Sequence, residues 1–222
     1  MHSLVQGWDF LSKGGPVMWP LLVCAVLSIT FMIERFVSLR RASQDNDGLL
    51  EEVRSLLNDG RADEALRLCQ NTPGTVPQLV ASAVRNRHLD AAAIERTMEE
   101  LAMRETPTLY KHLVYLDTII TLAPLLGLLG TVTGMISAFH VVASQTGLNA
   151  PTAITGGVAE ALIATATGLA IAIVTLVGYN LLTERVKEII ADMEARATQI
   201  LNILATMRSV EEKPLEVIAK RA

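Results

Sequence analysis

Hydrophobic residues gather in three long runs along this chain, and polar residues take over between them. The runs cover 16–33, 113–143 and 152–182. At a rise of 1.5 Å per residue, the shortest run would form a helix of about 27 Å, close to the thickness of the hydrocarbon core of a bilayer. The pattern therefore predicts an all-α membrane protein with three transmembrane helices and no strand.

Polar segments flank and separate the three runs. We expect a tail at 1–15, a helical water-facing domain at 34–112, a tight hairpin loop at 144–151 and an amphipathic C-terminal helix at 183–222. The hairpin carries no basic residue and the N-terminal tail carries only Lys13, whereas the two larger polar segments adjoin the runs with Arg35, Arg40, Arg41, Lys111, Arg185 and Lys187. Because basic residues favour the cytoplasmic side, the N-terminus and the hairpin should face out, and the C-terminus should face the cytoplasm.

The water-facing domain has its own helical pattern. Apolar residues recur at helical spacing near residue 50 (Leu49, Leu50, Val53, Leu56 and Leu57), and ADEALRLCQ predicts a short helix before a break at NTPGTVP. Asp90 should cap a helix that continues without a stop signal to Ala143, with Pro107 and Pro124 as kinks.

A last apolar stripe follows the third run, and charged residues occupy its opposite face. Its members are Val186, Ile189, Ile190, Met193, Ala197, Ile200, Leu201 and Leu204. The cytoplasmic segments are too small and too linear to cover all such stripes within one chain. A homo-oligomer is therefore favoured over packing within a single chain.

Composition narrows the chemistry. Half of the residues are hydrophobic and 19% are charged, and the net charge of -4 indicates no anionic partner such as nucleic acid. Cys24 and Cys69 fall in different compartments, so they should not form a disulfide. Neither a metal-ligand spacing nor an enzyme motif is present, so we expect neither a cofactor nor an enzyme.

One carboxylate interrupts the third apolar run. Glu160 has no Lys or Arg in any of the three runs to neutralise it. An acid deep in a membrane helix costs roughly 2.5–3.5 kcal/mol, and burial without a cation favours its neutral form. This setting suits a proton relay. The alternative is a structural role, in which the protonated carboxyl group bonds a neighbouring helix.

Small residues form stripes on the second and third runs. The stripe of the second run comprises Gly127, Gly130, Thr131, Gly134 and Ala138, and that of the third comprises Gly157, Ala161, Ala164, Gly168 and Ala172. Such stripes let membrane helices approach closely. They predict a tight helix pair or a smooth wall against which another chain's helix lies.

Hydroxyl groups should lie at a similar depth to Glu160. Counted from the hairpin, Thr131 lies about 18 Å deep, Glu160 about 12 Å and Thr165 about 20 Å. Thr167 is nearly in line with Glu160 on the helix, whereas Thr165 is about 140° away. Each threonine has an alternative role, which is to bond its own helix backbone. Asp117, expected near Arg185, and His140 are expected at the membrane interfaces.

Two segments resemble a known family of membrane proteins. LAPLLGLLGTVTGMISAF (122–139) and GGVAEALIATATGLAIAI (156–173), together with GGPVMWPLL and IERF around the first run, are similar to the ExbB/TolQ proton channel family. MotA is a more distant relative. Three spans and a large polar segment after the first span also match the ExbB/TolQ branch.

This resemblance implies a pentameric ring in a bacterial inner membrane, with an outward side that is periplasmic. A single-span subunit resembling ExbD or TolR would lie inside the ring, and a TonB- or TolA-like protein would span the periplasm. The translocated proton would take the place of a cofactor, and membrane lipids would surround the ring, with a bound phospholipid left open.

The resemblance also assigns residues. Glu160, Thr131 and Thr165 match the family's proton pathway, and we expect secondary pore-lining positions at Thr167, Gly134, Gly157 and Gly168. The choice between Thr165 and Thr167 stays open on helix geometry. Two functions compete: a proton-channel or stator subunit of an energy-transducing motor, and a non-conducting scaffold in which Glu160 is only structural. The energised system, whether siderophore uptake, envelope constriction or gliding, is not specified by the sequence.

Overall fold

The computed structural model describes residues 14–43, 48–144 and 150–219. Within this part, the chain forms helices α2 (Met18–Ala42), α3 (Leu49–Asn58), α4 (Ala62–Asn71), α5 (Thr75–Arg85), α6 (Ala91–Tyr110), α7 (Leu113–Ser144) and α8 (Ala150–Ala219). The described residues include no strand, so the prediction of an all-α fold is confirmed. Most of the expected tail and hairpin, residues 1–13 and 145–149, lie outside the described residues.

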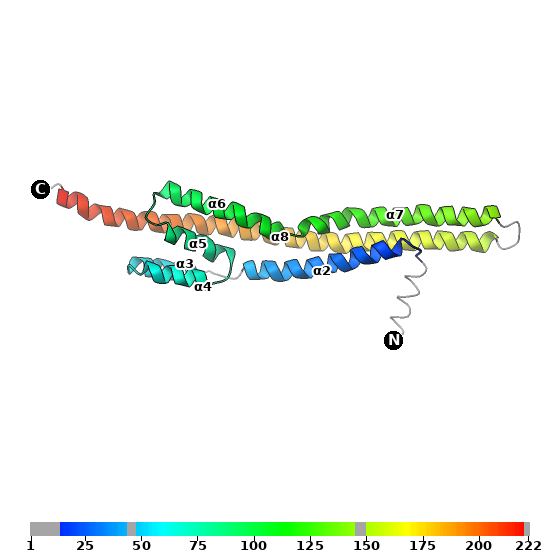
Figure 1. Ribbon diagram of the computed structural model, residues 1–222, viewed down its shortest axis with the longest axis horizontal. Helices are drawn as coiled ribbons and strands as arrows, with labels where there is room; N and C mark the ends of the chain where they lie inside the picture. Colours follow the sequence, from blue (N-terminus) through cyan, green and yellow to red (C-terminus); the bar gives the residue numbers. More distant parts are fainter. Residues whose placement is uncertain (1–13, 44–47, 145–149, 220–222) are drawn as a thin grey trace, which may run out of the picture. The chain divides into compact units, whose positions relative to one another are not determined.

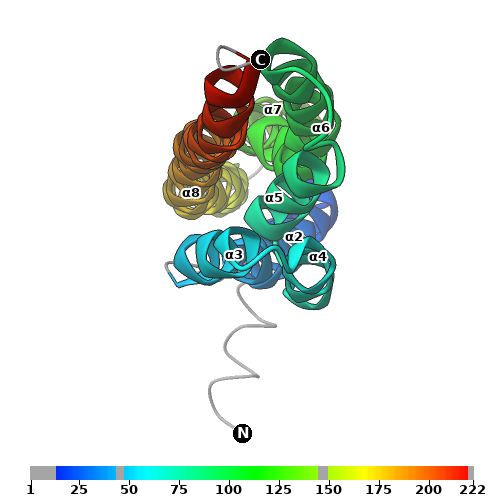
Figure 2. The same ribbon diagram turned by 90° about the vertical axis from the view of Figure 1, so that its left-hand side faces the viewer.

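The chain divides into two compact units. Unit 1 comprises Met1–Arg35 and His112–Leu182, and unit 2 comprises Phe36–Lys111 and Thr183–Ala222. Figures 1 and 2 show the helices of each unit. The boundaries between the units lie at 35/36, 111/112 and 182/183, each near an end of an apolar run.

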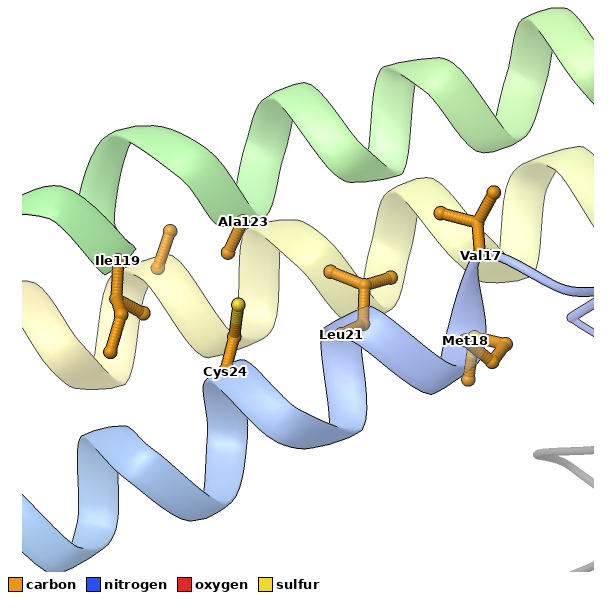
Figure 3. Packing of buried hydrophobic residues seen from close by; sticks show 7 residues of the cluster. Val17, Met18, Leu21, Cys24, Ile119 and Ala123 are labelled. Carbon is orange, nitrogen blue, oxygen red and sulfur yellow. The ribbon is translucent and has the colours of Figure 1, made fainter.

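Unit 1 consists of the apolar part of α2, helix α7 and the first part of α8. In Figure 1, α7 and α8 run side by side in opposite directions, and α2 lies along them. Leu21 and Cys24 of α2, together with Val17 just before it, belong to one buried cluster (Figure 3). The cluster also includes Ile119 and Ala123 of α7 and Ala172 of α8. Close packing of this kind holds membrane helices together without a large hydrophobic driving force.

Large apolar side chains cover the outside of unit 1. Leu125, Phe139, Leu162, Ile173 and Leu181 are each about half exposed or more. Three segments are long and apolar enough to cross a membrane: Met18–Ala42, Ala91–Val141 and Thr155–Met207. The prediction of three candidate transmembrane helices is therefore confirmed, since lipid would surround these side chains.

Helices α7 and α8 approach closely through their glycines. A methyl group on Gly127 would come 3.0 Å from Thr165 Cα, and one on Gly134 would come 2.9 Å from Gly157 O. A methyl group on Gly168 would overlap the carbonyl group of Ala123. The two small-residue stripes thus pack against each other within one chain, as the tight-pair alternative predicts.

Unit 2 packs short helices in series. Helix α3 contacts α4, α4 contacts α5, and α5 contacts α6. The predicted helix near residue 50 is α3, and it buries Leu49, Leu50, Val53 and Leu57. The apolar stripe of α8 is buried at Val186, Ile189, Met193 and Ile200. The helical patterns predicted for these segments are therefore confirmed.

The break predicted at NTPGTVP is only partly correct. The chain does leave the helical conformation after Asn71, and Gly74 has a φ of 135° that favours glycine. Helix α5 nevertheless begins at Thr75, so Val76 and Pro77 belong to its first turn. Proline is well accommodated there because the first N–H groups of a helix have no partner within the helix.

The prediction of one uninterrupted helix from Asp90 to Ala143 is wrong. Asp90 does cap a helix, since Ala93 N donates to Asp90 Oδ1 at 3.2 Å. That helix, α6, ends at Tyr110, because Lys111 leaves the helical region at ψ 138° and His112 adopts a φ of 66°. Pro107 and Pro124 lie inside α6 and α7 and end neither helix, as expected. In contrast, 152–182 and most of 183–222 lie in the single helix α8.

Candidate functional site

Glu160 lies on α8 and is half-buried against the beginning of α2. The Oε1, Cδ and Cγ atoms of Glu160 lie so close to the backbone of Gly15 that a methyl group on Gly15 would overlap them. Gly15 directly precedes the first turn of α2, where Met18 N donates to Gly15 O at 3.1 Å. The acid of the third span therefore meets the start of the first span.

No cation within the spans faces this carboxylate. The stretches 14–33 and 113–183 contain no Lys or Arg. Among the residues that the structure describes, no ion pair involves Glu160.

The three predicted threonines differ in what they bond. Thr131 Oγ1 donates to Leu128 O at 2.6 Å, and Thr167 Oγ1 donates to Ile163 O at 2.8 Å. These bonds to their own helices are what the structural alternative expects. Thr165 Oγ1 bonds Ala161 O at 3.2 Å and also Gly127 O of α7, at 3.0 Å. Thr165 is thus the threonine that links the two helices at this level, and the proton pathway stays a prediction.

The glycines predicted as secondary pore-lining positions are used for helix contact. Gly134, Gly157 and Gly168 are buried. A methyl group on Gly157 would come 2.7 Å from Ala138 Cβ and 2.8 Å from Gly134 O. This packing within one chain accounts for all three glycines, and it adds no support to a role in lining a pore.

A second polar contact in unit 1 is absent from the predictions. Ser28 Oγ of α2 and Thr175 Oγ1 of α8 are buried and lie 2.6 Å apart. Thr175 Oγ1 also bonds Ile171 O at 2.7 Å. Because Thr175 has one hydroxyl hydrogen, which that carbonyl accepts, Ser28 is the donor between the two hydroxyls. The signal in the sequence is weak, since a single serine in an apolar run is common.

An ion cluster at the far end of the first apolar run is also absent from the predictions. Arg35 Nε donates to Glu34 Oε2 at 2.8 Å, and Arg35 Nη2 donates to Glu34 Oε1 at 2.6 Å. His112 Nδ1 lies 2.9 Å from Glu34 Oε2. The imidazole ring of His112 also packs near the rings of Phe31 and Tyr115, with centroids 5.4 and 5.8 Å away. The adjacent Glu34 and Arg35 are visible in the sequence, but their partner His112 is not.

The remaining candidates occupy ordinary positions. Asp117 and His140 are exposed on α7. Arg185, which we expected near Asp117, donates to Ser43 Oγ at 2.7 Å and to Glu188 Oε2 at 2.6 Å. Among the described residues, neither Asp117 nor His140 forms a hydrogen bond or an ion pair with Glu160.

The described residues contain neither a disulfide nor a cluster of metal-ligating side chains. Cys24 and Cys69 are both free and buried, so the prediction that they do not pair is confirmed. Burial raises the pKa of the Cys69 thiol in unit 2 to about 11, which keeps it protonated and unreactive at neutral pH. Within the described part of the chain, no group of three or more metal-ligating side chains comes together.

Helical architecture and site together define a membrane protein with a carboxylate on a candidate transmembrane helix and no Lys or Arg in its three apolar runs. The chain belongs to the MotA/TolQ/ExbB proton channel family, whose model matches residues 72–195. The family name describes a channel and names no enzymatic activity.

Individual relatives support this assignment. An ExbB-like biopolymer transport protein of Synechocystis is 31% identical over 169 residues, which cover 75% of this chain and 80% of that protein. The biopolymer transport protein ExbB of Aquifex aeolicus is 40% identical over 147 residues, or 66% of this chain and 93% of its own length. The biopolymer transport protein exbB1 of Vibrio cholerae is 28% identical and is covered to 80%.

Proposed function

We propose that this chain is the proton-conducting subunit of an energy-transducing complex in a bacterial inner membrane. The complex is of the ExbB–ExbD or TolQ–TolR type and uses the proton motive force to drive an outer-membrane or envelope process. Five copies form a ring around the span of an ExbD- or TolR-like subunit, and a TonB- or TolA-like protein receives the energy. Unit 2 and the C-terminus face the cytoplasm, and the N-terminus faces the periplasm.

One observation carries this proposal: Glu160 is a half-buried carboxylate on a candidate transmembrane helix and has no cation in any span. A carboxylate bound to a fixed cation stays ionised and carries no proton. Glu160 is instead free to bind and release H⁺ when water or a partner's carboxylate reaches it. Thr131 and Thr165 lie on the facing helices α7 and α8, and their oxygens can accept hydrogen bonds from water there.

The scaffold alternative explains this arrangement less well. A structural carboxyl group needs a hydrogen-bond partner to offset the cost of burial. Among the described residues, no hydrogen bond of Glu160 to another side chain is present. Within this part of the chain, the polar tie to another helix that the scaffold alternative requires is therefore absent.

Proton flux through reconstituted complexes tests the function. The full chain and its single-span partner subunit are placed in liposomes with an imposed pH gradient, and an enclosed pH-sensitive dye reports proton entry. Glu160→Gln keeps the size and hydrogen-bonding capacity of the side chain but cannot exchange the proton. We expect flux to fall by about a hundredfold, the scale of a lost proton-transfer group.

Asp117→Asn is the matched control, because Asp117 is an exposed acid on α7. It should leave flux unchanged, and Glu160→Asp should retain part of it. If Glu160→Gln conducts like the unaltered chain, Glu160 does not exchange the conducted proton and the proposal is wrong. If neither chain conducts, the scaffold alternative holds.

A further inference from the structure

The backbone of Gly15, just before α2, packs directly against the Glu160 carboxyl group. Gly15 lies against Oε1, Cδ and Cγ of Glu160. No side chain intervenes at this contact, because glycine has none. The carboxyl group is therefore packed on this side against main-chain atoms just before the first span.

Two independent features require glycine at position 15. A Cβ atom there would overlap the Glu160 carboxyl group. In addition, Gly15 has a φ of 72°, in the left-handed region that L side chains rarely adopt. The first feature concerns Glu160 and the second concerns only the turn, so substitutions can separate them.

The turn is held in place on its other side. Gly14 is buried, and a methyl group on it would overlap Met18 and come 3.2 Å from Ile163 Cγ2. Val17, Met18 and Leu21, which follow in the chain, are buried in the apolar cluster of unit 1 (Figure 3). A backbone segment anchored in this way cannot retreat easily when a neighbour pushes against it.

We propose that Gly15 is a positioning residue for Glu160: the Gly14–Gly15 turn fixes the direction in which the carboxyl group points. This role rests on the proposed function, in which Glu160 exchanges the proton. The fixed backbone at Gly15 restricts the orientations that the carboxyl group can adopt. The proton is exchanged on the side of the carboxyl group that faces away from Gly15. A side chain at position 15 would push the carboxyl group away from this orientation.

Chemical labelling of Glu160 tests the orientation without relying on proton flux. A hydrophobic carbodiimide reacts with protonated carboxyl groups in apolar surroundings, and mass spectrometry of the peptide that carries Glu160 measures the rate. In the full chain with its partner subunit, we expect Gly15→Ala to change this rate severalfold and to reduce proton flux. Assembly is monitored by size-exclusion chromatography.

Gly156→Ala is the matched control. Gly156 lies one helical turn before Glu160 on α8, and a methyl group on it would meet nothing within 4 Å. Labelling and flux should match those of the unaltered chain. Should assembled Gly15→Ala label at the same rate as Gly156→Ala, Gly15 does not position Glu160 and the proposal falls.

A double-mutant cycle covers the case in which Gly15→Ala assembles poorly. The thermal midpoint is compared for Gly15→Ala in the unaltered chain and in the Glu160→Ala background, where no carboxyl group remains to be overlapped. The strain of the turn is common to both, so the difference isolates the contact with Glu160. We expect the midpoint to fall by several degrees more when Glu160 is present, and equal falls would overturn the proposal.

The two hypotheses fail separately. If Glu160→Gln conducts protons normally, the proposed function is wrong whatever Gly15→Ala does. If Glu160→Gln abolishes flux while Gly15→Ala leaves labelling and the cycle unchanged, only the positioning role is wrong.

Discussion

Two carboxylates of unit 1, Glu34 and Glu160, lie near opposite ends of the first span and have different surroundings. Glu34 bonds both the Arg35 guanidinium and the His112 imidazole. Glu160 meets the backbone of Gly15 and has no basic partner in the spans. The same chemical group thus sits once in a closed ion cluster and once against main-chain atoms.

This difference separates a structural acid from an exchangeable one. A carboxylate bound by a guanidinium through two parallel bonds is held ionised in a fixed geometry. Glu34 therefore connects α2 to the start of α7, and proton exchange would break those bonds. Glu160 has no such bonds to any described residue, so proton binding and release break none of them.

Among the variants that test this difference, the largest effect is expected from placing a cation beside Glu160. Gly156→Lys places an ammonium group four residues before Glu160 on the same helix, at a position with open space. Opposite charges about 4 Å apart attract by roughly 4 kcal/mol at an effective dielectric constant near 20. The carboxylate would then stay ionised, and we expect proton flux in liposomes to fall at least about tenfold.

Gly156→Gln controls for the length of the new side chain. It adds a similar volume without charge and should conduct nearly normally. Equal flux in the lysine and glutamine variants would contradict the view that freedom from a cation is what Glu160 requires.

The converse change removes the cation from the other carboxylate. The Arg35 side chain is 5% exposed and that of Glu34 is 43% exposed, so solvent screens part of their attraction. Arg35→Met should lower the free energy of unfolding by about 1–3 kcal/mol, measured by thermal unfolding in detergent. Proton flux per assembled complex should stay unchanged, because this cluster plays no part in exchange.

An exposed ion pair provides the control for Arg35. Arg54 and Glu51 lie 3.9 Å apart on α3, with both side chains more than half exposed. Arg54→Met should change stability by no more than about 0.5 kcal/mol. A complete loss of flux in assembled Arg35→Met would show that the two carboxylates are not functionally distinct.

His112 offers a smaller test of the same cluster. It bonds Glu34, packs against two aromatic rings and has a φ of 66°, where asparagine is tolerated better than alanine. His112→Ala should cost about 1–2 kcal/mol and His112→Asn less, both measured by thermal unfolding. Equal losses would indicate that the backbone conformation contributes nothing, and then only the bond and the ring contacts matter.

Patterns local in sequence could be predicted, and contacts between distant segments could not. The three apolar runs, the cap at Asp90 and the isolation of Glu160 all follow from nearby residues. The contact between Gly15 and Glu160 depends on how α2 packs on α8, which no spacing within either segment encodes. The end of α6 cannot be predicted for a related reason: His112 takes a left-handed conformation that its tertiary partners stabilise.

The smallest expected effect on stability comes from an uncharged hydrogen-bonded pair, which involves neither carboxylate. Ser28 donates to Thr175 between α2 and α8, and Thr175 also bonds the carbonyl of Ile171. Ser28→Ala removes one hydrogen bond but leaves the Thr175 hydroxyl bonded to its own helix. We therefore expect a loss of about 0.6 kcal/mol, typical of hydrogen bonds between membrane helices. Thr30→Ala, which removes an exposed bond within α2, is the control. A loss as large as that of Arg35→Met would mean that this hydroxyl pair stabilises the packing of the first span as much as the Glu34 cluster does.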